Sequence, residues 1–532
     1  MRFASTRYEI LIFLTGAATL SLEVLASRIM TPYFGVSLYI WSGILSITLA
    51  FLAIGYQIGG KLTQTWSRRA VEYAFLGAPI VSAIFITLST LLYPLLFPWL
   101  SQVNLIVGSF VGASVILALP LIALSAMNPL LISLQASEQG AGDGGAGRVF
   151  FISTMGSVTG VLATAFLFIP NVTNFRGTLM LCTGLGLTSL IYLWGARHLD
   201  QDHKRHLFIA AAIAIIISLV PMVEKDKYLN FISAQRISSS ITIERSYKIV
   251  AEYTSMFGNI KIAEVQNADG TGEVEKQLIH DGLVQNRTRL DNSSLTEYTD
   301  VLEELVQLYA PEARDVLVLG LGAGIVPRKL ASAGKKVSVV EINDVTLMAA
   351  IEHFGFEEDK ASVFIEDART YARACSGQFD ALVVDLFLGD NVPDYLTTKE
   401  FFGDLRACLR ADGALVMNAF FDSENSVPNG RLLATIATAF PDISISGASS
   451  GNVYLAGTTG QEFAHWSEKG DEPVTDLSFF SSRSSQRVNP ALYQDLAPIT
   501  DEHNIFSLLF SDANMAMRQY LAGELPPHIL VN

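Results

Sequence analysis

Four positions in the second half of the chain carry groups that can bind a ligand or accept a proton. Each follows or ends a run of apolar residues: the glycines of "VLVLGLGAGIVPRKL", Glu341 of "KKVSVVEIN", Asp367 of "ASVFIEDA" and Asp385 of "FDALVVDLF". Apolar strands that alternate with helices predict a parallel sheet, and such sheets bind ligands at the carboxyl ends of their strands. The sequence therefore predicts one site at which these positions meet.

The residue types at these positions indicate a nucleoside-like ligand. Gly320, Gly322 and Gly324 permit a tight turn and a close approach of the backbone to a ligand at the start of a helix. Glu341, which lies 17 residues beyond Gly324, is placed to accept hydrogen bonds from ribose hydroxyls. These two features are equally compatible with a dinucleotide and with an adenosyl ligand.

The acid after the third strand favours the adenosyl ligand. Asp367 is placed to bind the exocyclic amine of adenine, although an aspartate before "ARTYA" is also typical of a helix N-cap. The alternative for Glu341 is a solvated strand end. The capping role and the binding role of Asp367 are compatible with each other.

Other elements must hold these residues in place. Short alternating runs between residues 241 and 285, "SYKIVAEY", "NIKIAEV" and "KQLIHDGLV", predict a small antiparallel sheet. The helical periodicity of "LTEYTDVLEELVQLYA" follows, ending near Pro311. The expected fold of the second half is thus a small β domain and then an α/β doubly wound, Rossmann-like domain.

The first half of the chain is built differently, because its apolar stretches reach the roughly 20 residues needed to cross a bilayer. Residues 1–223 contain 11 Lys+Arg and 7 Asp+Glu, which leaves 25 and 44 for the rest of the chain. An acidic second half of this kind repels phosphate backbones, so nucleic acid is not an expected partner. About seven spans are expected: Tyr8–Met30, Leu38–Gly60, Val71–Leu95, Asn104–Leu134, Val149–Pro170, Gly177–Trp194 and Leu207–Val223.

Small residues four positions apart recur within these spans. The pairs are Gly55/Gly59, Gly108/Gly112 and Gly156/Gly160, and such pairs allow helix backbones to approach closely. They predict that the helices pack into one bundle. The bundle could also serve as the contact surface of a homo-oligomer.

The orientation of the bundle raises a conflict. The basic loops Lys61–Arg69 and Arg197–Arg205 should face the cytoplasm, and seven spans would then leave the second half outside. An adenosyl ligand is made in the cytosol, so we expect the second half there. On this argument the count of seven is wrong by one, with Leu207–Val223 or Asn104–Leu134 being re-entrant or double.

The three cysteines, Cys182, Cys375 and Cys408, have no ligand-type spacing. We therefore expect neither a disulfide framework nor a metal site.

The second half resembles the spermidine synthases, which are polyamine aminopropyltransferases, and the whole chain resembles bacterial proteins in which such a domain follows membrane helices. "FGNIKIAEV" and "IHDGLVQNRTRLD" are similar to the family's β domain, and "GLGAG…R" stands where the family has "GGGDGG…R". "VVEIN", "EDA", "VVDLF" and "YLTTKEFF" follow at family-like spacing. The resemblance covers Glu244–Leu409 by motif and implies a bacterial inner-membrane protein.

The resemblance also implies roles for individual residues. Gln285 and the Gly320–Gly324 loop, which includes Ala323, would contact the sulfonium end of decarboxylated S-adenosylmethionine or of the product methylthioadenosine. Glu341 would hold the ribose, and Asp367 with the adjoining Ala368 the adenine. Asp385 would be the catalytic acid that accepts hydrogen bonds from the attacking amine and helps to deprotonate it. No metal is implied.

Several departures from the family pattern concern the amine. The loop aspartate that grips the aminopropyl amine is Ala323 here, and the family's "YHE" is replaced by "LTE", Leu295–Glu297. "DSSDP" becomes "DLFLGD", with Asp390 as a candidate for the second acid. A cationic diamine would lose charge-assisted hydrogen bonds of about 1.5–3 kcal/mol each, so ordinary spermidine synthesis is in doubt.

Three hypotheses follow. The first is a membrane-bound spermidine synthase-like enzyme that transfers an aminopropyl-type group to an amine, such as a polyamine, and releases methylthioadenosine. The second is a lyase that cleaves S-adenosylmethionine to methylthioadenosine and homoserine lactone; methyl transfer, giving adenosylhomocysteine, is a variant. The third is non-catalytic: a pocket that senses an adenosyl ligand and regulates the membrane bundle, or a bundle that exports a product. Asp385 favours catalysis over sensing.

The expected domains are a transmembrane bundle over 1–223, a small β domain with the start of a linker helix over 224–298, and an adenosyl-binding catalytic domain over 299–532. Near the end, "APITDEHNIF", Ala497–Phe506, is a polar turn that could close over the site or be an ordinary exposed loop.

Overall fold

The computed structural model describes residues 2–35, 38–139, 145–196, 199–239, 245–387, 392–422, 425–447, 452–458, 474 and 485–532. The chain forms two compact units. We call residues 1–243, 254–256 and 518–532 the helical unit, and residues 244–253 and 257–517 the α/β unit. The boundaries expected from the sequence, 1–223, 224–298 and 299–532, remain a prediction.

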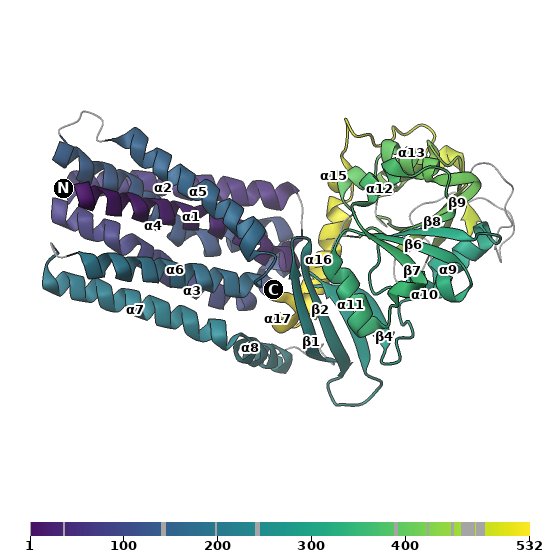
Figure 1. Cartoon of the computed structure of the whole chain (residues 1–532), viewed down its shortest axis with the longest axis horizontal. Helices are drawn as coiled ribbons and strands as arrows, with labels where there is room; N and C mark the ends of the chain where they lie inside the picture. Colours follow the sequence, from purple (N-terminus) through teal and green to yellow (C-terminus); the bar gives the residue numbers. More distant parts are fainter. Residues whose placement is uncertain are drawn as a thin grey trace. The chain divides into compact units, whose positions relative to one another are not determined.

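Long helices make up most of the helical unit (Figure 1). Their bounds are α1 Arg2–Phe34, α2 Leu38–Thr65, α3 Arg68–Val103, α4 Leu105–Gln139, α5 Ala146–Ala163 with a π turn at Thr164–Phe168, α6 Asn174–Gly195, α7 Gln201–Val223 and α8 Lys225–Ser239. Within the described residues, seven of these helices are long and apolar enough to cross a membrane by length and composition. Their number equals that of the apolar stretches in the sequence, and it does not support the expectation that the count of seven is wrong by one.

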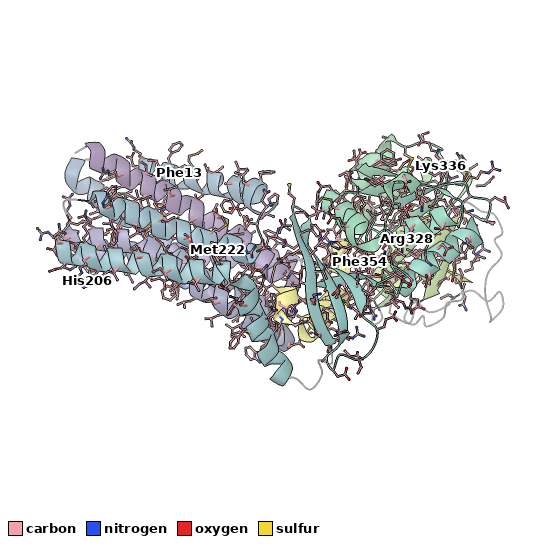
Figure 2. All side chains as sticks on the ribbon, turned by 60° about the horizontal axis from the view of Figure 1, so that its bottom comes forward. Phe13, His206, Met222, Arg328, Lys336 and Phe354 are labelled. Carbon is pink, nitrogen blue, oxygen red and sulfur yellow. A yellow bond between two sulfur atoms is a disulfide. The ribbon has the colours of Figure 1, made fainter. Side chains whose placement is uncertain are left out.

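The small-residue pairs lie where helices touch, as predicted. A Cβ added to Gly156 or Gly160 of α5 would lie 2.0 Å from the Phe13 carbonyl oxygen or 2.3 Å from that of Ala17, both in α1. Phe13 is labelled within the bundle in Figure 2. Gly55 and Gly59 of α2 face the α4 backbone in the same way, and Gly108 faces the backbone of α3. The prediction that these glycines pack helices together is confirmed.

The two segments that were expected to account for an extra or missing span are ordinary helices. The segment around Asn104–Leu134 belongs to a single helix of 35 residues, α4, which contains Pro120 and Pro129. The last span is a helix of 23 residues, α7, because it begins at Gln201, well before Leu207. The expectation that one of these segments is re-entrant or double is therefore not supported.

The last residues of the chain pack inside the helical unit. The Phe175 N–H donates to the Asn532 carbonyl oxygen at 2.7 Å, and His528 Nδ1 lies 2.8 Å from the Ser233 hydroxyl oxygen. Asn532 is buried. The short helix α17, Pro527–Leu530, thus belongs to the core of this unit.

The α/β unit contains the predicted small antiparallel sheet, in the order β1-β2-β3-β4. Its strands are β1 Arg245–Ser255, β2 Gly258–Asn267, β3 Glu275–His280 and β4 Leu283–Arg289. The run "KQLIHDGLV" becomes two strands because Asp281 and Gly282 adopt positive φ and turn the chain.

The second sheet has the order β12-β10-β11-β9-β8-β5-β6-β7. Its strands are β5 Asp315–Leu319, β6 Lys336–Glu341, β7 Ala361–Ile365, β8 Phe379–Val384, β9 Leu409–Phe420, β10 Asp442–Gly447, β11 Asn452–Thr458 and β12 Gln486–Arg487. The five strands from β9 to β7 are parallel, as predicted. The sheet continues with antiparallel β11, β10 and β12, so it is mixed.

Helices α10 to α13 connect the parallel strands, α9 precedes them, and further helices follow. The helices are α9 Glu297–Tyr309, α10 Ile325–Ser332, α11 Asp344–Phe354, α12 Ala368–Ala374, α13 Lys399–Cys408 and α14 Ser426–Ala437, followed by α15 Phe506–Leu509 and α16 Ser511–Glu524, with 3-10 turns at Glu358–Lys360, Asp394–Leu396 and Pro490–Leu492. Strand β5 is buried from Val316 to Leu319. The order of the sheet reverses at this strand, because β6 lies on one side of it and β8 on the other.

Two of the three cysteines form a disulfide, contrary to the expectation from the sequence. Cys375 follows α12 and Cys408 ends α13, and their Cα atoms are 4.9 Å apart. Their separation of 33 residues matched no framework, and the packing of the two helices is what pairs them. Cys182 is free and buried.

Candidate functional site

A cavity of about 250 Å³ opens at the carboxyl ends of the parallel strands. It lies where the strand order reverses, which is the usual binding position of an open α/β sheet. Residues from the small sheet complete its wall, among them Ile260, Leu278 and Gln285. Of the predicted site residues, the cavity is lined by Gln285, Gly320, Gly322, Glu341, Asp367, Ala368 and Asp385.

The glycine loop follows β5 directly. Gly320 has a φ of +94°, and a Cβ there would lie 2.1 Å from the Asp385 carbonyl oxygen. Gly322 has a φ of +53°, and its Cβ would lie 2.7 Å from Asn286 Oδ1. Both positions therefore require glycine, for conformation and for space.

The second half of the loop turns away from the cavity. Ala323 is buried in an apolar cluster with Ile260, Ile262 and Leu278, and neither Ala323 nor Gly324 is among the described residues that line the cavity. A Cβ on Gly324 would lie 2.7 Å from the Phe356 ring. Ala323 and Gly324 thus pack on the side of the loop that faces away from the cavity.

Glu341 ends β6 and is buried rather than solvated. One carboxylate oxygen accepts the Leu321 N–H at 3.0 Å, and the other accepts the Asn343 N–H at 2.9 Å. Burial raises the pKa of Glu341, and these backbone hydrogen bonds oppose that shift. The carboxylate therefore ties the glycine loop to the end of β6.

Asp367 caps a helix and also lines the cavity. Its Oδ1 accepts the Thr370 N–H at 2.9 Å and caps α12, which confirms the capping role. Its Oδ2 accepts the Tyr395 hydroxyl at 2.7 Å, and Asp367, Ala368 and Tyr395 all line the cavity.

Asp385 lies just beyond β8, and its N–H donates to Leu319 O at 2.9 Å. Asn418 Nδ2 donates to Asp385 Oδ1 at 2.9 Å. Burial raises the pKa of Asp385, and hydrogen bonds from Asn418 and Tyr298 lower it. Asp385 is thus a desolvated carboxyl group that faces the cavity, as a general base requires.

Several polar residues at the cavity were not predicted from the sequence, among them Asn286 and Tyr298. Asn286 follows Gln285 on β4, and Tyr298 follows the "LTE" segment at the start of α9. Both line the cavity. Asn286 could have been predicted, because it is a polar residue next to Gln285, a predicted ligand contact. No local sequence feature indicated that Tyr298 belongs to the site.

The charge of the cavity wall is mostly acidic. The described lining residues include four carboxyl groups, those of Glu341, Glu366, Asp367 and Asp385, and no lysine or arginine. Apolar and aromatic groups such as Phe257, Leu278, Leu386, Phe387 and Leu396 lie between them. Such a wall suits a ligand that combines a positive charge with an apolar ring.

The predicted polar turn near the end of the chain supports the cavity from outside. The Asp501 carboxylate accepts two hydrogen bonds from Arg369, at 2.8 and 2.5 Å, and Arg369 also donates to the Tyr395 carbonyl oxygen at 2.9 Å. Because Tyr395 holds Asp367, this turn braces one wall of the site. Asp390, the candidate second acid, lies outside the described residues.

A family model described as "Spermine/spermidine synthase domain" matches residues 295–442. The chain is 33% identical to the polyamine aminopropyltransferase of Vibrio vulnificus over 123 residues, which are 22% of this chain and 41% of that protein. It is 29% identical to polyamine aminopropyltransferase 2 of Hyperthermus butylicus over 198 residues, covering 32% and 63%. The chain thus spans less than two thirds of these relatives.

Another relative is the N-terminal histidine N-methyltransferase of Emericella nidulans, 33% identical over 138 residues, covering 25% of this chain and 24% of that one. Among solved structures, a probable spermidine synthase from Corynebacterium glutamicum aligns with a TM-score of 0.39 at 17% identity, over 48% of this chain and 97% of that chain.

Proposed function

Because the chain carries a spermine/spermidine synthase domain and has polyamine aminopropyltransferases among its homologues, we propose that it is a membrane-bound enzyme of the aminopropyltransferase type. It binds S-adenosylmethionine or its decarboxylated form in the cavity of the α/β unit. It then breaks the bond between sulfur and the γ-carbon and releases methylthioadenosine.

The observation that carries this proposal is the position of Asp385. Its desolvated carboxyl group lies in one cavity with Glu341 and Asp367, the groups proposed to hold ribose and adenine. The attacking amine nitrogen forms a bond to the γ-carbon, the bonding pair of the carbon–sulfur bond stays on sulfur, and the amine proton passes to Asp385. The leaving group is then neutral methylthioadenosine.

The lyase is a second candidate, supported by the surroundings of Ala323. This residue lies in an apolar cluster, so the loop offers no carboxylate to an aminopropyl ammonium and none that would repel the carboxylate of S-adenosylmethionine. In the lyase that substrate carboxylate attacks its own γ-carbon. The products are homoserine lactone and methylthioadenosine.

The helical unit suits attachment to a bilayer, because seven of its described helices have the necessary length and composition. We place it in a bacterial inner membrane. We expect the α/β unit in the cytoplasm, where the sulfonium substrate is made. A homo-oligomer through the bundle belongs to the same proposal.

The test uses the full chain in detergent. It is incubated with S-adenosylmethionine alone, or with decarboxylated S-adenosylmethionine plus putrescine, and the products are identified by mass spectrometry. We expect methylthioadenosine, and Asp385→Asn should lower its rate on the order of a hundredfold or more. Asp412→Asn, at an exposed acid of β9, is the matched control.

Methylthioadenosine from S-adenosylmethionine alone would establish the lyase. Its appearance only when the amine is present would establish transfer. Tight binding of methylthioadenosine without turnover of either substrate would leave a sensor, and equal rates for Asp385→Asn and wild type would remove Asp385 from the chemistry.

A further inference from the structure

A continuous row of hydrogen bonds links the glycine loop to Asp385. The Ala323 N–H donates to Asn286 Oδ1 at 2.9 Å, and Asn286 Nδ2 lies 2.8 Å from the Tyr298 hydroxyl oxygen. Tyr298 lines the cavity together with Asp385, and hydrogen bonding from Tyr298 lowers the pKa of that carboxyl group. Asp385 also accepts from Asn418 at 2.9 Å. Four elements, β4, α9, β8 and β9, meet in this row.

The direction of each bond follows from its first donor. A backbone N–H can only donate, so the Asn286 side-chain atom opposite Ala323 must be its oxygen. The amide nitrogen then faces Tyr298 and donates to the phenol oxygen. Since that oxygen accepts a hydrogen bond from Asn286, its own O–H is left to donate to Asp385.

From this geometry, and resting on the proposed function, we propose that Asn286 and Tyr298 are positioning residues for Asp385. Asn286 sets the direction of the Tyr298 hydroxyl, and that hydroxyl holds the Asp385 carboxylate in the orientation and protonation state that accept the amine proton. The row also makes this state depend on the conformation of the glycine loop.

The donors around Asp385 explain why Tyr298 affects the protonation of this carboxyl group. Its two side-chain donors, Asn418 and Tyr298, are neutral, and they are what opposes the effect of burial. The other titratable groups on this side are Tyr454 of β11, which interacts with Tyr298, and His280, Glu341, Glu366, Asp367 and Tyr395 around the cavity. Loss of the phenol hydroxyl would thus leave a desolvated carboxyl group with one donor fewer, which favours its protonated form.

The test follows the titration of the Asp385 carboxyl group by infrared spectroscopy on the full chain, with Asp385→Asn identifying its band. We expect Tyr298→Phe and Asn286→Asp to move the titration to higher pH. The first removes the donor, and the second offers the phenol O–H a competing acceptor. The acidic limb of kcat/KM for methylthioadenosine formation should move in the same direction, with a loss of roughly tenfold near neutral pH.

Tyr309→Phe is the matched control. Tyr309 is a buried tyrosine at the other end of the same helix, and its hydroxyl contacts Ser485 outside the cavity. We expect its removal to leave the titration unchanged. If Tyr298→Phe only lowers the unfolding temperature and titrates like wild type, the proposal is overturned.

The spectroscopic readout separates this proposal from the proposed function. A shifted titration in a protein that turns over neither substrate would support the positioning row and reject the reaction. Turnover with an unshifted titration would support the reaction and reject the positioning row.

Discussion

At the scale of single residues, the carboxylates of Glu341 and Asp385 are held in different ways. Glu341 accepts two backbone N–H groups, those of Leu321 and Asn343, whereas Asp385 is held by the side chains of Asn418 and Tyr298. Backbone donors make Glu341 part of the frame of the site. Side-chain donors leave Asp385 with a protonation state that single substitutions can change.

This difference predicts the result of Glu341→Gln. The amide keeps one acceptor oxygen, and its NH2 group faces a backbone N–H that it cannot satisfy, so the loop loses a charge-assisted hydrogen bond. We expect the affinity for methylthioadenosine, measured by calorimetry, to fall roughly tenfold or more. Glu358→Gln, at an exposed acid of the same unit, should bind like wild type, and equal affinities for both variants would contradict this role of Glu341.

At the scale of elements, the turn after β5 depends on the absence of a side chain. Gly320 and Gly334 both have positive φ, +94° and +80°, but a Cβ on Gly320 would meet the Asp385 carbonyl oxygen at 2.1 Å, whereas one on Gly334 has no neighbour within 4 Å. Alanine substitutions at the two glycines therefore distinguish the energetic cost of backbone strain from that of steric contact.

Gly334→Ala should cost about 1–2 kcal/mol of unfolding free energy, from the left-handed backbone alone. Gly320→Ala should cost clearly more, because strands β5 and β8 must also move apart, and it should weaken the binding of methylthioadenosine. Thermal unfolding of the two variants with and without that ligand provides the measurement. Similar destabilisation and similar binding would show that the contact with Asp385 is unimportant.

The packing of α5 on α1 allows a similar comparison between helices. A Cβ on Gly156 would lie 2.0 Å from the Phe13 carbonyl oxygen, whereas Gly184 of α6 has no neighbour within 4 Å. We expect Gly156→Ala to lower the unfolding temperature of the detergent-solubilised protein. Gly184→Ala should leave it unchanged or raise it slightly, since alanine favours a helix by up to about 1 kcal/mol over glycine. The same response in both variants would contradict close packing at Gly156.

At the scale of the whole molecule, the side of the membrane on which the α/β unit lies links the two halves of the proposal. The cytosolic supply of the substrate predicts the cytoplasmic side. The basic residues at the start of α3 and α7, with seven crossings, predict the opposite side. We hold to the cytoplasmic side, because the proposed chemistry requires it.

An introduced cysteine can test this expectation. The chain's own cysteines are buried, so Glu358→Cys in the α/β unit and Gln201→Cys at the start of α7, both exposed positions, provide single reactive thiols. We expect an impermeant maleimide to label Glu358→Cys only after cell lysis. Labelling of this variant in intact cells, with Gln201→Cys protected, would place the α/β unit outside and would exclude a cytosolic substrate.

Local sequence patterns were enough to predict the parallel strands and helices of the α/β unit and several strand-end residues of its site. Apolar runs form the parallel strands, and Gly320, Glu341, Asp367 and Asp385 sit at their ends because their spacing along the chain places them there. The count of apolar helices followed in the same way from their length, since crossing a bilayer needs a continuous apolar segment. These features depend on residues that are close in the sequence.

Features that depend on contacts between distant segments could not be predicted from the sequence and emerge from the folded structure. Tyr298 reaches Asp385, 87 positions later, Asp501 reaches Arg369, and Cys375 pairs with Cys408. Ala323 was predicted with the loop, yet its side chain lies in an apolar cluster with residues of β2, β3, α10 and α11. Local sequence patterns cannot predict such partners, because packing between elements brings them together. The residues around the proposed base, Asp385, come together in this way.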